Sequence, residues 1–264
     1  MSVLEEIYWI AWREVRHYFR SRLGMASRLL QAATWLILVG SIFSGTSELL
    51  QSVGFRGSYY QYIAPGVIVM IVIFGSIFGG MTTIWDRRFG YFQKQLAAPI
   101  ARYSLALGKV MAISLISGIQ SLIILAMALL LGVRVGTGIL GGIAVILIAM
   151  LLAIGFASIS VIIATVATTS EAFWSVINLI GLPLVFLSSA LFPPVLVPSW
   201  LATIIKYNPL TYAVYAIQAL MNPSYKAGAG IPPFGDIAII FIFDAAMLIL
   251  STYLFRRETR RLIA

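Results

Sequence analysis

Side chains that commonly do chemistry in proteins are scarce in this sequence. There is no cysteine and His17 is the single histidine, so thiolate chemistry and histidine metal clusters are excluded, and a Ser-His-Asp triad could draw on His17 alone. We interpret His17 as a solvated or lipid-facing residue. Gly108-Lys109 is not a nucleotide site, because a P-loop would need glycine where Tyr103 stands and Ser or Thr where Val110 stands. We expect no catalytic residue, metal site or cofactor in this chain.

Two polar residues lie inside otherwise apolar stretches. Asp244 follows Ile-Phe-Ile-Phe, and a charged group in a membrane costs a few kcal/mol and normally faces protein or water. Two interpretations stay open: Asp244 lines a translocation route, or it is protonated or paired with a neighbouring helix. Asn178 is the second candidate for the route, although an amide at such a position usually joins helices.

Aromatic and basic side chains are interleaved over residues 86–109. A docking surface needs aromatic anchors to bury and charges to orient the partner. A short helix over 91–98 is expected to end at Pro99, because the residue before a proline is biased away from the α region. The alternative is a short helix that lies flat on the membrane.

Seven prolines interrupt the apolar segment 193–235. Asn208-Pro209 is an N-cap followed by proline at the first helical position, which predicts a helix over 210–221. A shorter helix is expected over 200–207. Both are too short to span a membrane, so we expect them to dip into the outer leaflet or lie along it; an ordinary external loop is the alternative and would be more polar.

The elements that position these residues are membrane helices. Of the 264 residues 61% are hydrophobic and 10% charged, and the mean hydropathy is +0.98, which indicates lipid as the solvent. The fold class is therefore all-α, as a single membrane domain over 1–264, and no stretch alternates as a β-barrel strand would. Six segments are long enough to cross the bilayer: 29–50, 62–85, 110–133, 139–167, 173–192 and 237–255.

The basic residues predict the orientation. Fourteen of the 18 lysines and arginines lie before the first span, between the second and third spans, or after the sixth. Because cytoplasmic flanks carry such an excess, both ends of the chain are expected in the cytoplasm. The same rule accounts for the net charge of +9 without a nucleic-acid partner.

Residues 1–28 are expected to form an amphipathic helix at the membrane interface. A soluble helix packed on another domain is the alternative. The apolar face is Leu4, Ile7, Tyr8, Ala11, Trp12, Val15 and Phe19, and the opposite face is Glu6, Arg13, Arg16, His17 and Arg20.

The loop at 86–104 resembles that of ABC-2 type permeases, the membrane subunits of ATP-binding cassette exporters. The matching residues, in order, are Asp86-Arg87, Gly90, Leu96, Pro99-Ile100, Arg102 and Gly108-Lys109. The glutamate that the family usually carries near the start of this loop is not evident, so the ion-pair partners are left open.

The segment after the fifth span resembles the same family more closely. It carries Pro183, Leu187-Ser188, Leu191-Phe192-Pro193, Pro198-Ser199-Trp200-Leu201, Asn208-Pro209-Leu210-Thr211-Tyr212 and Gln218, where the family more often has arginine at the last position. The resemblance covers nearly the whole chain. Among the multidrug, lipid and polysaccharide branches it is nearest to daunorubicin-resistance-like permeases.

The resemblance implies a permease subunit in the cell membrane, in contact with its lipids, that pairs with a second permease copy and two cytoplasmic ATPase subunits, where ATP and magnesium would bind. It implies that lipophilic compounds, lipids or lipid-linked glycans are exported. The implied ATPase-coupling residues are Asp86, Arg87, Arg88, Phe89, Gly90, Tyr91, Lys94, Leu96, Pro99 and Arg102. The implied outer gate, within 193–235 and at its edge, is Phe192, Pro193, Asn208, Pro209, Tyr212 and Gln218.

Two other functions were weighed against export. An ion-coupled secondary transporter would favour internal repeats and midplane charges, and Asp244 alone fits that description. An intramembrane enzyme would need paired carboxylates, a histidine-rich motif or a nucleophile cluster, which the sequence lacks.

Overall fold

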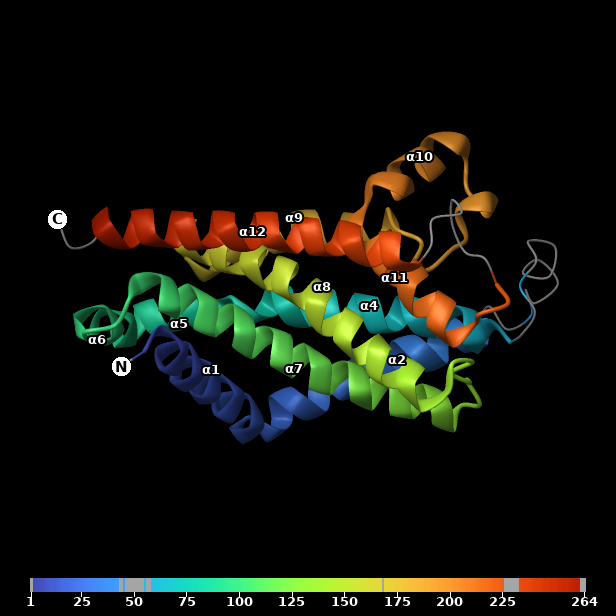
Figure 1. The fold of residues 1–264 in the computed structure, drawn as a ribbon, viewed down its shortest axis with the longest axis horizontal. Helices are drawn as coiled ribbons and strands as arrows, with labels where there is room; N and C mark the ends of the chain where they lie inside the picture. Colours follow the sequence, from blue (N-terminus) through green and yellow to red (C-terminus); the bar gives the residue numbers. More distant parts are fainter. Residues whose placement is uncertain are drawn as a thin grey trace.

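The computed structural model describes residues 2–42, 45, 55, 58–167, 169–225 and 233–261, and in these residues all regular structure is helical. The long helices run along one axis (Figure 1). Helix α1 begins and helix α12 ends at the end of the molecule that carries α6, here called the α6 end. Helices α10 and α11 lie at the opposite end, here called the α10 end. The elements are α1 (Val3–Arg20), α2 (Arg22–Ile42), α4 (Tyr59–Gly79), α5 (Met81–Arg88), α6 (Tyr91–Ala97), α7 (Arg102–Leu130), α8 (Gly138–Val166), α9 (Ser170–Phe186), the 3-10 turn η2 (Pro194–Leu196), α10 (Ser199–Tyr207), α11 (Pro209–Met221) and α12 (Pro233–Arg261).

Four described helical stretches are long and apolar enough to cross a membrane: 59–88, 102–130, 138–166 and 234–259. They correspond to four of the six predicted spans. The other two are shorter where described, as Ala33–Ile42 within α2 and Ser170–Phe186. Residues 43, 44 and 46–50 of the first predicted span lie outside the described residues, so the count of six stays a prediction.

The core of the bundle is formed by α4, α7, α8, α11 and α12, which pack on one another along their lengths. Helix α4 is buried through most of its length, with Ile63, Val67 and Ile73 inaccessible. By contrast α9 touches its neighbours at few points and exposes a row of large apolar side chains. Helix α4 is therefore a central element and α9 a peripheral one.

Three predicted boundaries differ clearly from the structure. Helix α9, which corresponds to the fifth predicted span, ends at Phe186 and not at residue 192. Three residues after Pro183 the chain leaves the helix and turns through Leu187 to Leu191. Helix α7, which contains the third predicted span, begins at Arg102, eight residues before the predicted start of that span at residue 110. The amphipathic helix ends at Arg20 rather than at residue 28, and Arg22 already starts α2.

Candidate coupling site

Helix α6 is set between two turns that the sequence dictates. Gly90 has φ +71°, a left-handed conformation that glycine adopts without strain, and it reverses the chain after α5. At the other end Ala98 is extended (ψ 149°) before Pro99. The predicted helix over 91–98 is confirmed as Tyr91–Ala97.

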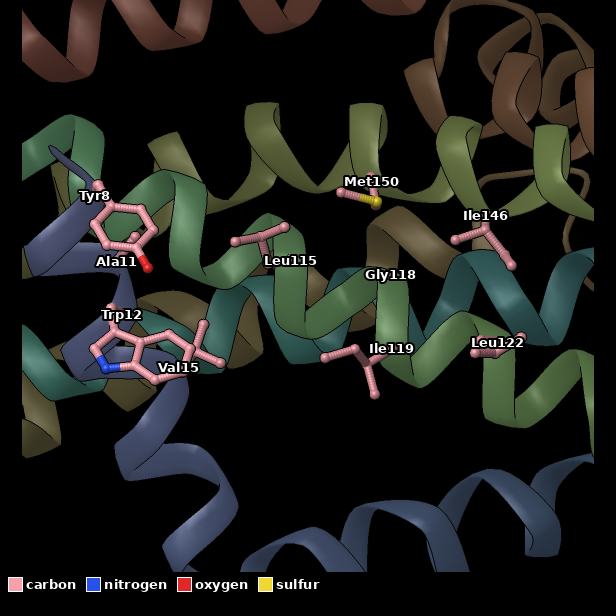
Figure 2. A pocket seen from close by; sticks show the side chains of 10 residues that line it. All are labelled: Tyr8, Ala11, Trp12, Val15, Leu115, Gly118, Ile119, Leu122, Ile146 and Met150. Atoms are coloured by element: carbon pink, nitrogen blue, oxygen red, sulfur yellow. The ribbon is translucent and has the colours of Figure 1, made fainter. Parts of the chain in front are cut away.

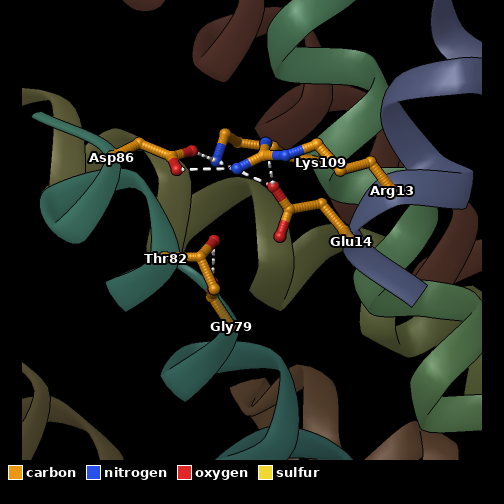
Figure 3. Close-up of polar contacts among 6 residues, drawn as sticks. All are labelled: Arg13, Glu14, Gly79, Thr82, Asp86 and Lys109. Carbon is orange, nitrogen blue, oxygen red and sulfur yellow. Dashed lines mark hydrogen bonds and ion pairs between the residues drawn. The ribbon is translucent and has the colours of Figure 1, made fainter. Parts of the chain in front are cut away.

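Four charged side chains from α1, α5 and α7 meet in one cluster, and Figure 3 shows their contacts. Asp86 of α5 accepts hydrogen bonds from Arg13 of α1 (Nη2–Oδ1 2.8 Å) and from Lys109 of α7 (Nζ–Oδ2 2.7 Å). Glu14 of α1 pairs through Oε1 with the same two cations, at 3.0 Å and 3.3 Å. We call Arg13, Glu14, Asp86 and Lys109 the ion cluster; it joins three helices.

The ion cluster is balanced in charge and largely shielded from solvent. The Lys109 side chain is 1% exposed, those of Glu14 and Asp86 about 10%. Burial disfavours the charged form of Arg13, yet its hydrogen bond to Asp86 and the nearby carboxylates raise the Arg13 pKa above its ordinary value. Two cations with two anions avoid an uncompensated buried charge, which would cost about 3–5 kcal/mol.

Helix α6 is fixed to its surroundings by aromatic contacts. The Arg13 guanidinium lies 4.1 Å from the centre of the Tyr91 ring, and that of Arg87 lies 5.0 Å from the Phe92 ring. Phe92 also packs edge-on against Phe255 of α12, with ring centres 5.9 Å apart. One short helix is thus attached to α1, α5 and α12.

Further contacts bind the same region to α7 and α8. Arg87 donates from Nη1 to the carbonyl of Thr165 (3.0 Å), in the last turn of α8. Glu6 of α1 accepts from the backbone N–H of Ala101 (3.1 Å), at the start of α7. Displacement of α6 therefore has a contact path into each of these helices.

The opposite face of this region points outward. Phe89 is 79% exposed, and the other exposed residues between 88 and 99 are Arg88, Tyr91, Gln93, Lys94, Ala97 and Pro99. We call these residues, together with Phe89, the coupling face. Beside it a cavity of about 360 Å³ separates α1 from α6, with Trp9, Arg13, Lys94 and Gln95 among its walls.

The predicted coupling residues therefore divide into two groups. Phe89, Arg88, Tyr91, Lys94 and Pro99 lie on the surface. Asp86 is buried, whereas Arg87, Gly90, Leu96 and Arg102 are half-buried. The structure thus separates the exposed side chains of this segment from those that hold it in place, and their role in coupling stays a prediction.

Sequence reasoning missed the carboxylate of the ion cluster that comes from α1. The ion-pair partners of the loop were left open, and one of them, Glu14, lies 72 positions before Asp86 in the chain. Glu6 and Arg13, assigned to the face opposite the apolar one, turn toward α7 and α5, whereas the apolar residues Leu4, Tyr8 and Trp12 are exposed. The eight-residue spacing of Glu6 and Glu14, about two helical turns, was the available signal.

At the α10 end Asn208 joins two helices. Its Nδ2 donates to the carbonyls of Leu184 and Leu187, both at 2.7 Å, and its Oδ1 accepts from the N–H of Leu210 (3.0 Å). The amide of Asn208 therefore provides hydrogen-bond donors for two carbonyls at the end of α9 and caps the first turn of α11. The predicted N-cap is confirmed, as is the helix that starts at Pro209.

The other predicted gate residues lie around this junction. Tyr212 donates from its hydroxyl to the carbonyl of Lys206 (2.6 Å). Gln218 is 1% exposed, Pro193 is buried, and Phe192 is 39% exposed. The residues share one end of the molecule, and whether they gate a pathway stays a prediction.

The two route candidates are placed differently. Asp244 is 3% exposed and its carboxylate lies against Gly155 of α8, where a side chain on residue 155 would collide with it. Asn178 is exposed on α9. Asp244 therefore faces the interior of this chain, and Asn178 faces away from it.

Known proteins resemble this chain over most of its length. Residues 5–222 match the family described as ABC-2 type transporter. A putative transport permease ycf38 of Cyanophora paradoxa is 31% identical over 84% of this chain and 76% of its own. A daunorubicin resistance ABC transporter permease protein of Streptomyces coeruleorubidus is 23% identical over 80% of this chain and 69% of its own.

A probable doxorubicin resistance ABC transporter permease protein of Mycobacterium tuberculosis is 24% identical over 59% of this chain and 56% of its own. The family match spans the ion cluster, the coupling face and the Asn208 junction. The chain thus belongs to the ABC-2 type transporter family, as a membrane permease subunit whose ATP hydrolysis resides in a separate subunit.

Proposed function

We propose that this chain is the membrane half of an ATP-driven exporter that moves a lipophilic compound, a lipid or a lipid-linked glycan outward. The observation that carries the proposal is the two-sided arrangement of α6. Its outer side is the exposed, basic and aromatic coupling face, and its inner side is attached to three other helices. Two relatives named for resistance to daunorubicin and doxorubicin support a lipophilic substrate.

The proposed assembly contains two ATPase subunits and a second permease copy. One chain of this size cannot easily enclose a route for a large solute, so the route would lie between two permeases. The exposed side of α9 supports this arrangement, because Leu179, Leu182 and Phe186 are left exposed by the described part of the chain. Asn178 lies on the same helix.

We further propose six crossings of the plasma membrane, with α2 and α9 as the two beyond the four long ones, and with the α6 end in the cytoplasm. The distribution of basic residues supports the orientation. ATP-driven closure of the ATPase pair would push on the coupling face. The ion cluster would pass this movement to α1 and α7, and helices at the Asn208 junction would open the outer end.

Ion-coupled transport is not the favoured alternative, because the family match is to an ATP-dependent class. The experiment that separates docking from other defects is charge reversal on the coupling face. Arg88→Glu combined with Lys94→Glu should abolish co-purification with the partner ATPase, and transport with it, because both basic side chains are exposed on the coupling face and their reversal leaves the ion cluster intact.

The matched control is Lys206→Glu, an exposed lysine at the α10 end, which should keep ATPase binding. Equal binding by the reversed and control proteins would overturn the docking role of α6. A permease that binds no ATPase in either form would overturn the exporter itself.

A further inference from the structure

An apolar groove lies where α1 meets the middle of α7 and α8, away from the coupling face. Its volume is about 410 Å³, and its walls include Trp12, Val15, Leu115, Ile119 and Met150. Helices α7 and α8 are 29 residues long and apolar enough to span a membrane, and the lining positions fall near the centres of both. The groove therefore opens to hydrocarbon.

The groove is elongated along α7, as Figure 2 shows. Residues of α1 stand at one end, and Leu122 and Ile146 stand at the other. From Leu115 to Leu122 the groove follows α7 for about 10 Å, most of the roughly 15 Å depth of one leaflet. Its shape suits an extended chain that runs from α1 toward the middle of the bilayer.

The α1 end has the character of a headgroup boundary. Tyr8 and Trp12 are about half exposed there, and such rings place their polar tip at the interface and their apolar body in lipid. Arg16, which is exposed, follows Trp12 by four residues, so it lies one helical turn further along, at the border between the apolar and the polar face of α1. The carboxylate of Glu14, in contrast, is turned toward the ion cluster.

We infer that this groove binds one acyl chain of an anionic phospholipid from the leaflet on the α6 side. The tail lies along Leu115, Ile119 and Leu122, and the phosphate lies beside Arg16. Apolar walls at hydrocarbon depth select a lipid tail over water, and Arg16 selects a negative headgroup. The inference does not depend on export, because it concerns binding to the resting permease.

Quenching of Trp12 fluorescence tests the site, since Trp12 lines it. The other five tryptophans are replaced by Phe, and the purified permease in detergent is titrated with phosphatidylglycerol or phosphatidylcholine brominated on the acyl chain. Saturable quenching at about one lipid per chain is expected, with tighter binding of phosphatidylglycerol. Quenching that rises in proportion to total lipid without saturation would overturn the site.

Filling the groove provides the matched comparison. Ile119→Phe should weaken binding about tenfold, because displacing roughly two methylene groups at about 0.8 kcal/mol each amounts to about that factor. Leu130→Phe makes a similar change at an exposed residue of α7 outside the groove and should leave binding unchanged. Val15→Phe fills the groove from α1 and carries the test if Ile119→Phe fails to fold.

The headgroup is tested separately. Arg16→Gln should remove the preference for phosphatidylglycerol and keep the saturable binding of phosphatidylcholine. Equal quenching curves for Ile119→Phe and Leu130→Phe would refute the acyl-chain site, and an undiminished preference in Arg16→Gln would refute the assignment of the phosphate.

Discussion

At the scale of residues, Lys109 shows how a charge is kept in a place from which water is excluded. Its Nζ is shared by two carboxylates on different helices, at 2.7 Å from Asp86 and 3.3 Å from Glu14. Taking such ions out of water costs several kcal/mol for each, so a cluster of this kind is weak evidence for added stability. Its value lies in geometry: any change in the relative positions of α1, α5 and α7 would separate opposite charges.

Removal of the Lys109 charge should therefore be costly. Lys109→Met leaves two buried carboxylates with Arg13 alone, and we expect a loss of about 3–5 kcal/mol in stability, seen as a lower unfolding temperature in detergent. Lys109→Met combined with Asp86→Asn restores the charge balance and should recover much of the loss. Lys206→Met, at an exposed lysine, is the control; an equal effect of both single changes would contradict the buried pairing.

Asp244 tests the translocation route. Asp244→Asn keeps the size of the side chain against Gly155, so membrane assembly and the elution profile should be unchanged, while transport by reconstituted permease and ATPase should fall. Because the side chain is buried between α8 and α12, a substrate could reach it only if these helices separate. Wild-type transport in Asp244→Asn would remove this residue from the route.

At the scale of elements, broken helices are held by single polar side chains. The fifth span was predicted to continue to residue 192, so the end of α9 at Phe186 would lie inside the membrane. An unpaired carbonyl there costs several kcal/mol. Asn208 supplies both donors that Leu184 and Leu187 need, and at the same time starts α11. The Asn-Pro pair is thus a joint between two helices as well as a cap.

Loss of this joint should destabilise the α10 end. Asn208→Ala removes two hydrogen bonds to half-buried carbonyls and one N-cap, and we expect a loss of about 2–4 kcal/mol, measured by thermal unfolding. Asn178→Ala removes the same chemical group from an exposed position on α9 and should change stability by less than about 0.5 kcal/mol. Comparable losses of stability in both variants would show that the hydrogen bonds of Asn208 do not stabilise the α10 end.

At the scale of the whole molecule, α6 and the α10–α11 pair lie at opposite ends of the long helices (Figure 1). Helix α1 begins and α12 ends beside α6. If the long helices cross the bilayer, the coupling face and the Asn208 junction are therefore on opposite sides of it. The basic residues predict which side is cytoplasmic.

This orientation can be checked cleanly because the chain has no cysteine. Lys206→Cys and Lys94→Cys are each exposed single reporters at the two ends. In intact cells a membrane-impermeant maleimide should label Lys206→Cys and leave Lys94→Cys unlabelled until the membrane is permeabilised. Labelling of Lys94→Cys in intact cells would reverse the orientation and, with it, the assignment of the coupling face to the ATPase.

Much of this fold could be predicted because it depends on local pattern. Long apolar runs predict the four long helices, Pro99 the end of α6, and Asn208-Pro209 the start of α11. Each signal lies within a few residues of its effect. The end of α9 was misplaced because the turn after Pro183 is held by contacts from Asn208, more than 20 residues further along the chain.

The sequence by itself determined that the chain is a helical membrane protein with a basic, aromatic segment between two of its spans, because composition and local spacing decide solvent and helix type. Only the tertiary structure decided that Glu14 and Lys109 meet Asp86, that α1 turns its acidic side to α7, and that Asp244 faces Gly155. These pairings depend on which helices pack together and at what rotation, and neither is encoded in the residues next to them.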